Sequence, residues 1–358
     1  MKKMIIYELR KLMGKRIVLL GILAVFVLNI LFAVTTYRNM YAFDGSGREG
    51  TGMEAIAIDK ELARKYEGAL TDAKVQSMLA EFRPTSDLHG MNVKYLYQNS
   101  IQSAVHARFA DLNGGWNGLT VADVYGGDTV QVAYVNGWLN VSGYMARVLV
   151  ILNVLLIFMA APAFAGDYGG VDSLILSARY GHTRCATAKN VAALMASLGI
   201  TAAFVLFNLI FALAVYGGEG LGGSILFAPV EFSEGYIPYN MTCATLILWQ
   251  SGLALLCAAA VTGITLLISA VCKSPAAAMI VSMGAFLLPF MIPVSETNPL
   301  YRLLLLNPVF YVQFLSVMSA QPLGNGSMYA GLAVPAAMIV TALGVFASRR
   351  VFAGHQVS

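Results

Sequence analysis

Residues 17–35 read IVLLGILAVFVLNILFAVT and contain no charged side chain. A helix needs about 20 consecutive apolar residues to cross the hydrocarbon core of a bilayer. The run follows a basic start, as a signal peptide would, but it is longer than a signal h-region and has no clear small-x-small cleavage site. We therefore interpret it as a retained transmembrane helix.

Five more apolar runs follow, and the composition agrees with them. Apolar residues make up 58% of the 358-residue chain, charged residues only 12%, and the mean hydropathy is +0.69. A soluble domain carries roughly 25% charged residues. The sequence therefore predicts an all-α polytopic membrane protein with six transmembrane helices, at residues 17–35, 144–165, 191–216, 242–271, 276–294 and 328–347.

The flanking charges predict the topology. Cytoplasmic loops are enriched in Lys and Arg. Residues 1–16 hold six cations and one acid, whereas the predicted outer loop 217–241 holds three Glu and no cation. The remaining short predicted cytoplasmic segments also carry cations, namely Arg179, Arg184, Lys189, Lys273, Arg349 and Arg350. Both termini, including the tail 348–358, are therefore expected in the cytoplasm.

Two regions outside the six spans are expected on the outer side. Residues 36–143 predict a mainly helical extracytoplasmic domain, with helices near 52–67, 71–84 and 93–109 followed by turns and short strands. Residues 295–327 are apolar but contain Arg302 and the step Asn307–Pro308. Proline removes a backbone donor and disfavours helix in the preceding residue. We predict a broken re-entrant or interfacial hairpin there.

Motifs for catalysis are absent from the sequence. It contains no G-x-x-x-x-G-K-[ST] loop, no H-E-x-x-H motif and no paired acids inside a predicted span. The four cysteines form no C-x-x-C pair and are interpreted as buried structural thiols: Cys185, Cys243, Cys257 and Cys272. We expect no catalytic, metal or cofactor site and no enzyme activity. Because no span holds an acid that could carry a coupling ion, the energy for any transport is expected from another chain.

Residues 1–16, MKKMIIYELRKLMGKR, predict an amphipathic helix at the inner membrane surface. Its apolar side chains fall on one face and most of its cations on the other. A plain topogenic charge cluster is the alternative, and the two interpretations are compatible. The candidate residues of this interfacial helix are Tyr7, Glu8, Arg10 and Lys11.

The cytoplasmic loop 166–190 is the second candidate site. From residue 164 to 189 the sequence reads FAGDYGGVDSLILSARYGHTRCATAK, in which Asp172 and Ser173 can cap a short amphipathic helix that Gly181 ends. A short helix between two spans at the inner surface offers a contact for a cytoplasmic motor. A purely topogenic role for its cations is the alternative.

This loop resembles that of the permease subunit of bacterial type-2 ABC transporters. In that family an acidic residue and a Gly precede a leu-leu-leu-ser helix, a small basic turn with Gly follows, and a Lys opens the third span. The matching positions are Asp167, Gly170, 174–177, Arg179, Gly181, Arg184 and Lys189, while His182 departs from the Arg common in the family and Gly169–Gly170 is more flexible than usual. The basic helix, the order of spans and the broken hairpin also match the family.

The resemblance implies a transport subunit of an ATP-driven exporter in the bacterial plasma membrane. Two permease chains, identical or different, would pair, and two soluble ATPase subunits holding ATP and Mg would dock beneath them. No nucleic-acid partner is expected. The residues expected to couple to the ATPase are Asp167, Asp172, Leu174, Arg179, Gly181, His182, Arg184 and Lys189. The alternative function is a membrane sensor or scaffold whose outer domain binds an envelope ligand or partner.

Overall fold

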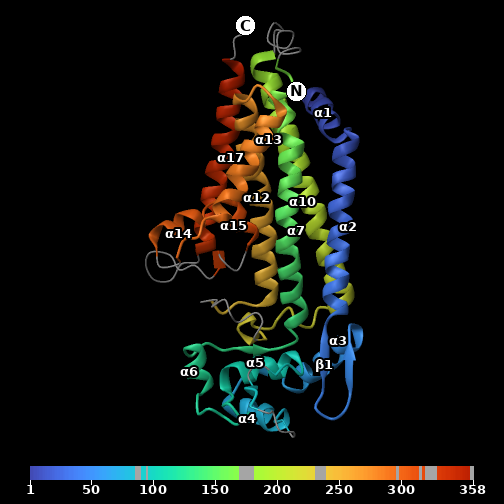
Figure 1. Ribbon diagram of the computed structural model, residues 1–358, viewed down its shortest axis with the longest axis vertical. Coiled ribbons are helices and arrows are strands. Elements are labelled where there is room, and N and C mark those ends of the chain that lie inside the picture. Colours follow the sequence, from blue (N-terminus) through green and yellow to red (C-terminus); the bar gives the residue numbers. More distant parts are fainter. Residues whose placement is uncertain are drawn as a thin grey trace. The chain divides into compact units, whose positions relative to one another are not determined.

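The computed structural model describes residues 1–84, 90–93, 96–168, 181–229, 239–295, 298–313, 317–318 and 329–354 (Figure 1). The chain divides into two compact units. Unit 1 consists of Met1–Asn29, Ala146–Phe207 and Gln250–Ser358, and unit 2 of Ile30–Met145 and Asn208–Trp249. Each unit is described by itself below.

The predicted all-α class is confirmed. The described chain is mostly helical, and its strands form two two-stranded sheets. Five helical segments in the described residues are long and apolar enough to cross a membrane. They are α2 (Arg16–Arg38), Asn136–Ala165, Thr183–Tyr216, α12 (Cys243–Val271) and α17 (Tyr329–Ala353).

The apolar run predicted to be the fifth span forms the shorter helix α13, Pro275–Met291. The predicted second span corresponds to α7 (Asn136–Ala160) and the short α8 (Pro162–Ala165). Helix α7 begins eight residues before the predicted start at 144. Its first turns escaped the hydropathy pattern because they alternate polar residues such as Asn136 with large side chains such as Trp138, which is buried.

Unit 1 packs its helices through small and aromatic residues. A Cβ atom added to Gly344 in α17 would lie 2.3 Å from the carbonyl oxygen of Gly263 in α12, so the two backbones touch there. Such close approach through small residues is typical of membrane helix pairs. The Phe26 ring of α2 lies 5.0 Å from that of Phe204 in α10 (Ala186–Tyr216).

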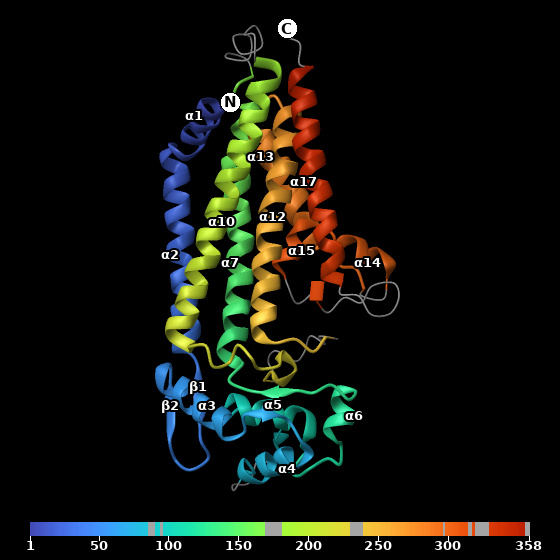
Figure 2. The same cartoon turned by 180° about the vertical axis from the view of Figure 1, so that it is seen from behind.

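Two short helices, α14 (Pro299–Leu304) and α15 (Pro308–Val312), occupy the region for which a broken hairpin was predicted. The side chain of Asn307 accepts the N–H of Val309 at 3.1 Å and donates to the Ala285 carbonyl of α13 at 3.3 Å. Figures 1 and 2 both show α15 beside α12. The Asn–Pro step therefore starts the second short helix and holds it against α13.

Apart from the parts of the long helices, the described residues of unit 2 form four α-helices and the 3-10 turn Ile225–Phe227. The α-helices are α3 (Met53–Lys65), α4 (Asp72–Glu81), α5 (Ser100–Phe109) and α6 (Val121–Tyr125). Strand β1 (Tyr41–Phe43) pairs with β2 (Glu49–Thr51), and β3 (Gly68–Ala69) pairs with β4 (Gln131–Val132), both antiparallel. The core includes the buried side chains Ile56, Met78, Leu79, Val105 and Phe109.

The predicted helices of unit 2 differ at their ends from the structure. Thr71 caps α4 as its sequence position suggests, because its hydroxyl accepts the N–H of Lys74 at 3.3 Å. Helix α5 begins at Ser100, not near residue 93, because the Asn99 side chain caps it by accepting the N–H of Gln102 at 2.7 Å. The hairpin β1–β2 was not predicted.

Candidate functional site

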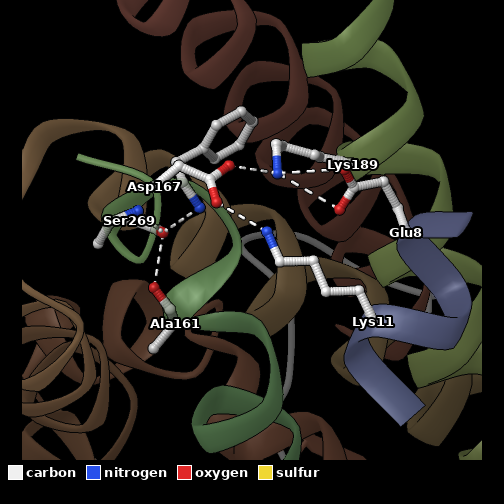
Figure 3. Close-up of polar contacts among 8 residues, drawn as sticks. Glu8, Lys11, Ala161, Asp167, Lys189 and Ser269 are labelled. Atoms are coloured by element: carbon white, nitrogen blue, oxygen red, sulfur yellow. Dashed lines mark hydrogen bonds and ion pairs between the residues drawn. The ribbon is translucent and has the colours of Figure 1, made fainter. Parts of the chain in front are cut away.

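Four charged side chains meet in unit 1 (Figure 3). The Lys189 ammonium lies 2.6 Å from Asp167 Oδ2 and 3.3 Å from Glu8 Oε1, and Lys11 Nζ donates to Asp167 Oδ1 at 2.7 Å. We call Glu8, Lys11, Asp167 and Lys189 the junction cluster. It joins the N-terminal helix α1 (Lys2–Met13) to the segment after α8 and to the first turn of α10.

Helix α1 supplies two members because of its amphipathic pattern. Glu8, Lys11 and Leu12 are spaced three or four residues apart, so they share one face of the helix. Leu12 and Glu8 are buried, whereas Lys3, Tyr7 and Arg10 are exposed. The inward face of α1 therefore carries a carboxylate as well as apolar side chains.

Asp167 is positioned by a break between α7 and α8. Pro162 has no N–H, and helical bonding is interrupted near it. Ser269 of α12 bridges the break, since its hydroxyl accepts the N–H groups of Phe164 at 3.0 Å and Ala165 at 3.1 Å. The same hydroxyl donates to the Ala161 carbonyl at 2.6 Å (Figure 3). The backbone leading to Asp167 is thereby fixed to α12.

Lys189 is positioned by the contact between α10 and α17. Its neighbour Asn190 donates to the Val345 carbonyl at 2.9 Å and to the Ser348 hydroxyl at 3.0 Å. The side chain of Lys189 is 1% exposed. The first turns of α10 are thus bonded to α1 through Lys189 and to α17 through Asn190.

The cluster is electrically balanced, with two carboxylates and two ammonium groups. Burying an isolated charge is very unfavourable, and a buried pair is acceptable when opposite charges and hydrogen bonds compensate it. Loss of any one member therefore leaves an uncompensated charge. Within the described residues, no group of three His, Cys, Asp or Glu side chains could hold a metal ion. This arrangement is suited to transmitting a displacement of one segment to the others, because it connects α1, the segment after α8 and α10.

The structure brings together four of the residues predicted from two separate segments: Asp167 and Lys189 from the loop, and Glu8 and Lys11 from the interfacial helix. Tyr7, Arg10 and Arg184 are exposed. Gly181 and His182 belong to the π-helical turn Gly181–Cys185 that leads into α10. Three further predicted residues lie outside the described residues: Asp172, Leu174 and Arg179.

Sequence reasoning missed the supporting residues Ser269, Asn190 and Ser348. Each is a neutral polar residue within an apolar helix, and no spacing pattern marks its partner. The four cysteines are free thiols, two of them buried and two half-buried. Burial of Cys243 and Cys257 agrees with a structural role for them.

Comparison with protein-family models, curated proteins and solved structures found no match for this chain. Its function is therefore inferred from its own residues.

Proposed function

We propose that this chain is the membrane-spanning permease subunit of an ATP-driven exporter of the type-2 ABC class. The supporting observation is the junction cluster, which bonds the interfacial helix α1 to both ends of the loop that resembles the motor contact of that family. Three members of the cluster are buried and Lys11 is 40% exposed, and separating the partners of a buried ion pair has a high free-energy cost. When the loop is displaced, α1 should therefore move with it, because the ion pairs remain intact.

In this proposal the chain crosses the membrane six times, with both termini in the cytoplasm. Helix α13 is the fifth of these crossings and is completed on the outer side by the short helices α14 and α15. Residues 36–143 form the extracytoplasmic domain. The positions of α1 and the end of α17 support an even number of crossings, because both lie at the same end of unit 1 in Figures 1 and 2. The basic residues of that end, among them Lys11 and Arg349, support the cytoplasmic side.

Coupling would proceed through the two neighbouring residues that open α10. An ATPase pressing on the loop would move Lys189 and Asp167 together, and α1 would follow through Glu8 and Lys11. Asn190 would pass the same movement to α17 through Ser348. Rigid elements with two discrete arrangements can carry such a displacement between sites. ATP and Mg are bound by the partner chain.

The test begins with the full-length chain purified from its native membrane in mild detergent. We expect a soluble P-loop ATPase to co-purify, and its ATP hydrolysis to change when the complex is reconstituted in liposomes. The reproducible absence of an ATPase contradicts the proposal and favours the sensor or scaffold.

A pair of variants then tests the coupling route. Glu8→Gln removes a charge from the junction cluster, whereas Arg10→Gln removes an exposed charge from the same helix. We expect the ATPase to remain bound in both variants and its stimulation by the permease to be lost only in Glu8→Gln. Equal stimulation in the two variants contradicts coupling through this cluster.

A further inference from the structure

A half-open cavity of about 280 Å³ lies in unit 1, outside the junction cluster. Its wall is apolar and comes from three parts of the chain: Ile17 from the start of α2, Phe158 from the end of α7, and Ala276 with Met279 from the start of α13. Ile17 and Ala276 are exposed, while Phe158 and Met279 are half-buried. The cavity is therefore open toward the surroundings of the helices and lined by hydrocarbon.

Lys15 is the one charged residue in the wall of this cavity. It is half-buried, and among the residues that the structure describes its ammonium takes part in no hydrogen bond or ion pair. Burial lowers the pKa of Lys15, as do the like charges of Lys11 and Lys189, while Asp167 opposes them. An anion beside this ammonium would restore the solvation that burial has removed.

More cations flank the cavity along the chain. Arg16 follows Lys15 directly, and Lys273 lies two residues before Pro275, which also lines the cavity. Arg16 and Lys273 are exposed. The apolar wall of the cavity therefore carries one half-buried ammonium, and two exposed cations lie close in sequence to residues that line it.

We propose that this cavity binds one anionic phospholipid, with an acyl chain against the apolar wall and the phosphate of the headgroup at Lys15. Basic pockets between transmembrane helices are suited to anionic headgroups, and an acyl chain is what an apolar opening between such helices meets in a bilayer. A free phosphate would leave the apolar wall exposed. An uncharged amphiphile would leave the Lys15 ammonium without a counter-charge.

The bound lipid would stand next to the junction cluster without belonging to it. Lys15 and Lys11 are four residues apart at the turn between α1 and α2, so a headgroup at Lys15 would also reduce the repulsion between them. The lipid would thus hold the turn after α1 in place. This inference depends on a membrane location and is independent of any ATPase.

The test measures the thermal unfolding temperature of the full-length chain in a neutral detergent as lipid is added. We expect phosphatidylglycerol to raise this temperature in a saturable way, and phosphatidylcholine or glycerol phosphate to leave it unchanged. Lys15→Gln should increase the phosphatidylglycerol concentration needed for half of the effect by about fivefold, the factor expected for losing one attraction between a lysine and a headgroup. Lys3→Gln, an exposed lysine on α1, is the matched control.

A second pair of variants tests the apolar half of the site. Ala276→Trp fills the cavity, whereas Ala277→Trp places the same side chain at an exposed neighbouring position that does not line it. We expect only Ala276→Trp to abolish the response to phosphatidylglycerol. If Lys15→Gln cannot be purified, the comparison of the two Trp variants alone decides whether this cavity is the lipid site.

Several results would overturn the inference. These are an equal response to phosphatidylcholine, an equal response to glycerol phosphate, and identical titrations for Lys15→Gln and Lys3→Gln. Identical responses of the two Trp variants would likewise exclude this cavity as the lipid site. Because no ATPase is present, these outcomes leave the proposed transport function untouched.

Discussion

Lys189 Nζ lies 2.6 Å from Asp167 Oδ2, and the two side chains are only 1% and 3% exposed. The pair joins the start of α10 to the backbone that follows α8. Each partner also contacts α1, Lys189 through Glu8 and Asp167 through Lys11. A buried pair of this kind contributes little net stability over an apolar replacement, but removal of one partner is strongly unfavourable. This asymmetry makes the pair testable.

Lys189→Met should lower the free energy of unfolding by about 3–5 kcal/mol, because the buried Glu8 then loses its ion-pair partner and Asp167 keeps only Lys11. The double variant Lys189→Met/Asp167→Asn should lose less than the sum of the two single variants, by about 1 kcal/mol or more. Denaturation in mixed micelles measures both quantities. Lys3→Met, on the exposed side of α1, is the control. Strict additivity of the two single variants would show that the pair is not coupled.

Ser269→Ala should destabilise unit 1 by about 1–3 kcal/mol, because two buried N–H groups and the Ala161 carbonyl lose their partner. Thr265→Val is the matched control on the same helix, since among the described residues the Thr265 hydroxyl donates only to Val261 within α12, at 2.8 Å. The same denaturation measurement applies. Equal losses in the two variants would mean that Ser269 does not hold the break between α7 and α8.

Gly344→Ala should weaken the contact of α17 with α12. The added Cβ would lie 2.3 Å from the Gly263 carbonyl oxygen, and overpacking of this kind costs about 1–3 kcal/mol. Gly331→Ala on the same helix meets no atom within 4 Å and should be neutral or stabilising. The unfolding temperatures of the two variants make the comparison, and a loss in both would indicate an effect of helix α17 alone.

Asp59 predicts a pH dependence in unit 2. Its side chain is fully buried and accepts the N–H of Ser100 at 3.0 Å and the amide of Asn136 at 3.5 Å. Burial raises the pKa of Asp59 from 3.8 to about 6, although these hydrogen bonds act in the opposite direction. The folded state therefore binds the proton more tightly than the unfolded state. The contribution of the protonated Asp59 to stability is present below about pH 4 and is lost as the pH rises through 6.

The expected loss between pH 4 and pH 6 is about 2 kcal/mol for wild type relative to Asp59→Asn. Wild type and Asp59→Asn must be compared at each pH, because the contribution of His106 to stability also depends on pH. Burial lowers the pKa of His106 to about 4, so its contribution to stability is lost as the pH falls from 6.5. Hydrogen exchange of α3 and α5 measures the stability, and Asp128→Asn, at an exposed position, controls for removal of a carboxylate. A difference that stays constant with pH would contradict this prediction.

Much of the helix framework could be predicted because hydropathy is a local property. The runs at 17–35 and 242–271 nearly coincide with α2 and α12, since each is long, apolar and bounded by polar residues. The cap of α4 is likewise local, since the Thr71 hydroxyl accepts the N–H of Lys74 only three residues further along the chain. The early start of α7 could not be predicted, because its first turns are stabilised by burial within unit 2.

The candidate site was predictable only in part. Acidic and basic residues in two short segments pointed to α1 and to the loop before α10. No sequence pattern paired Glu8 with Lys189, or assigned Ser269 to the break after α7. These partners lie far apart in the chain, and their meeting depends on how the helices pack.

The sequence by itself determined that the protein is a helical membrane protein, because the transfer of apolar side chains out of water depends on composition and run length. Tertiary structure alone decided which charges are buried together, and that Lys15, beside an apolar cavity, has no ion-pair partner among the residues that the structure describes. The reason is physical: the free energy of a buried charge is set by its neighbours within a few ångströms, and those neighbours come from remote parts of the chain. Lys189 and Lys15 both lie beside apolar runs of the sequence. Only their surroundings distinguish Lys189, which pairs with Asp167, from Lys15, for which we propose an anionic lipid as the partner.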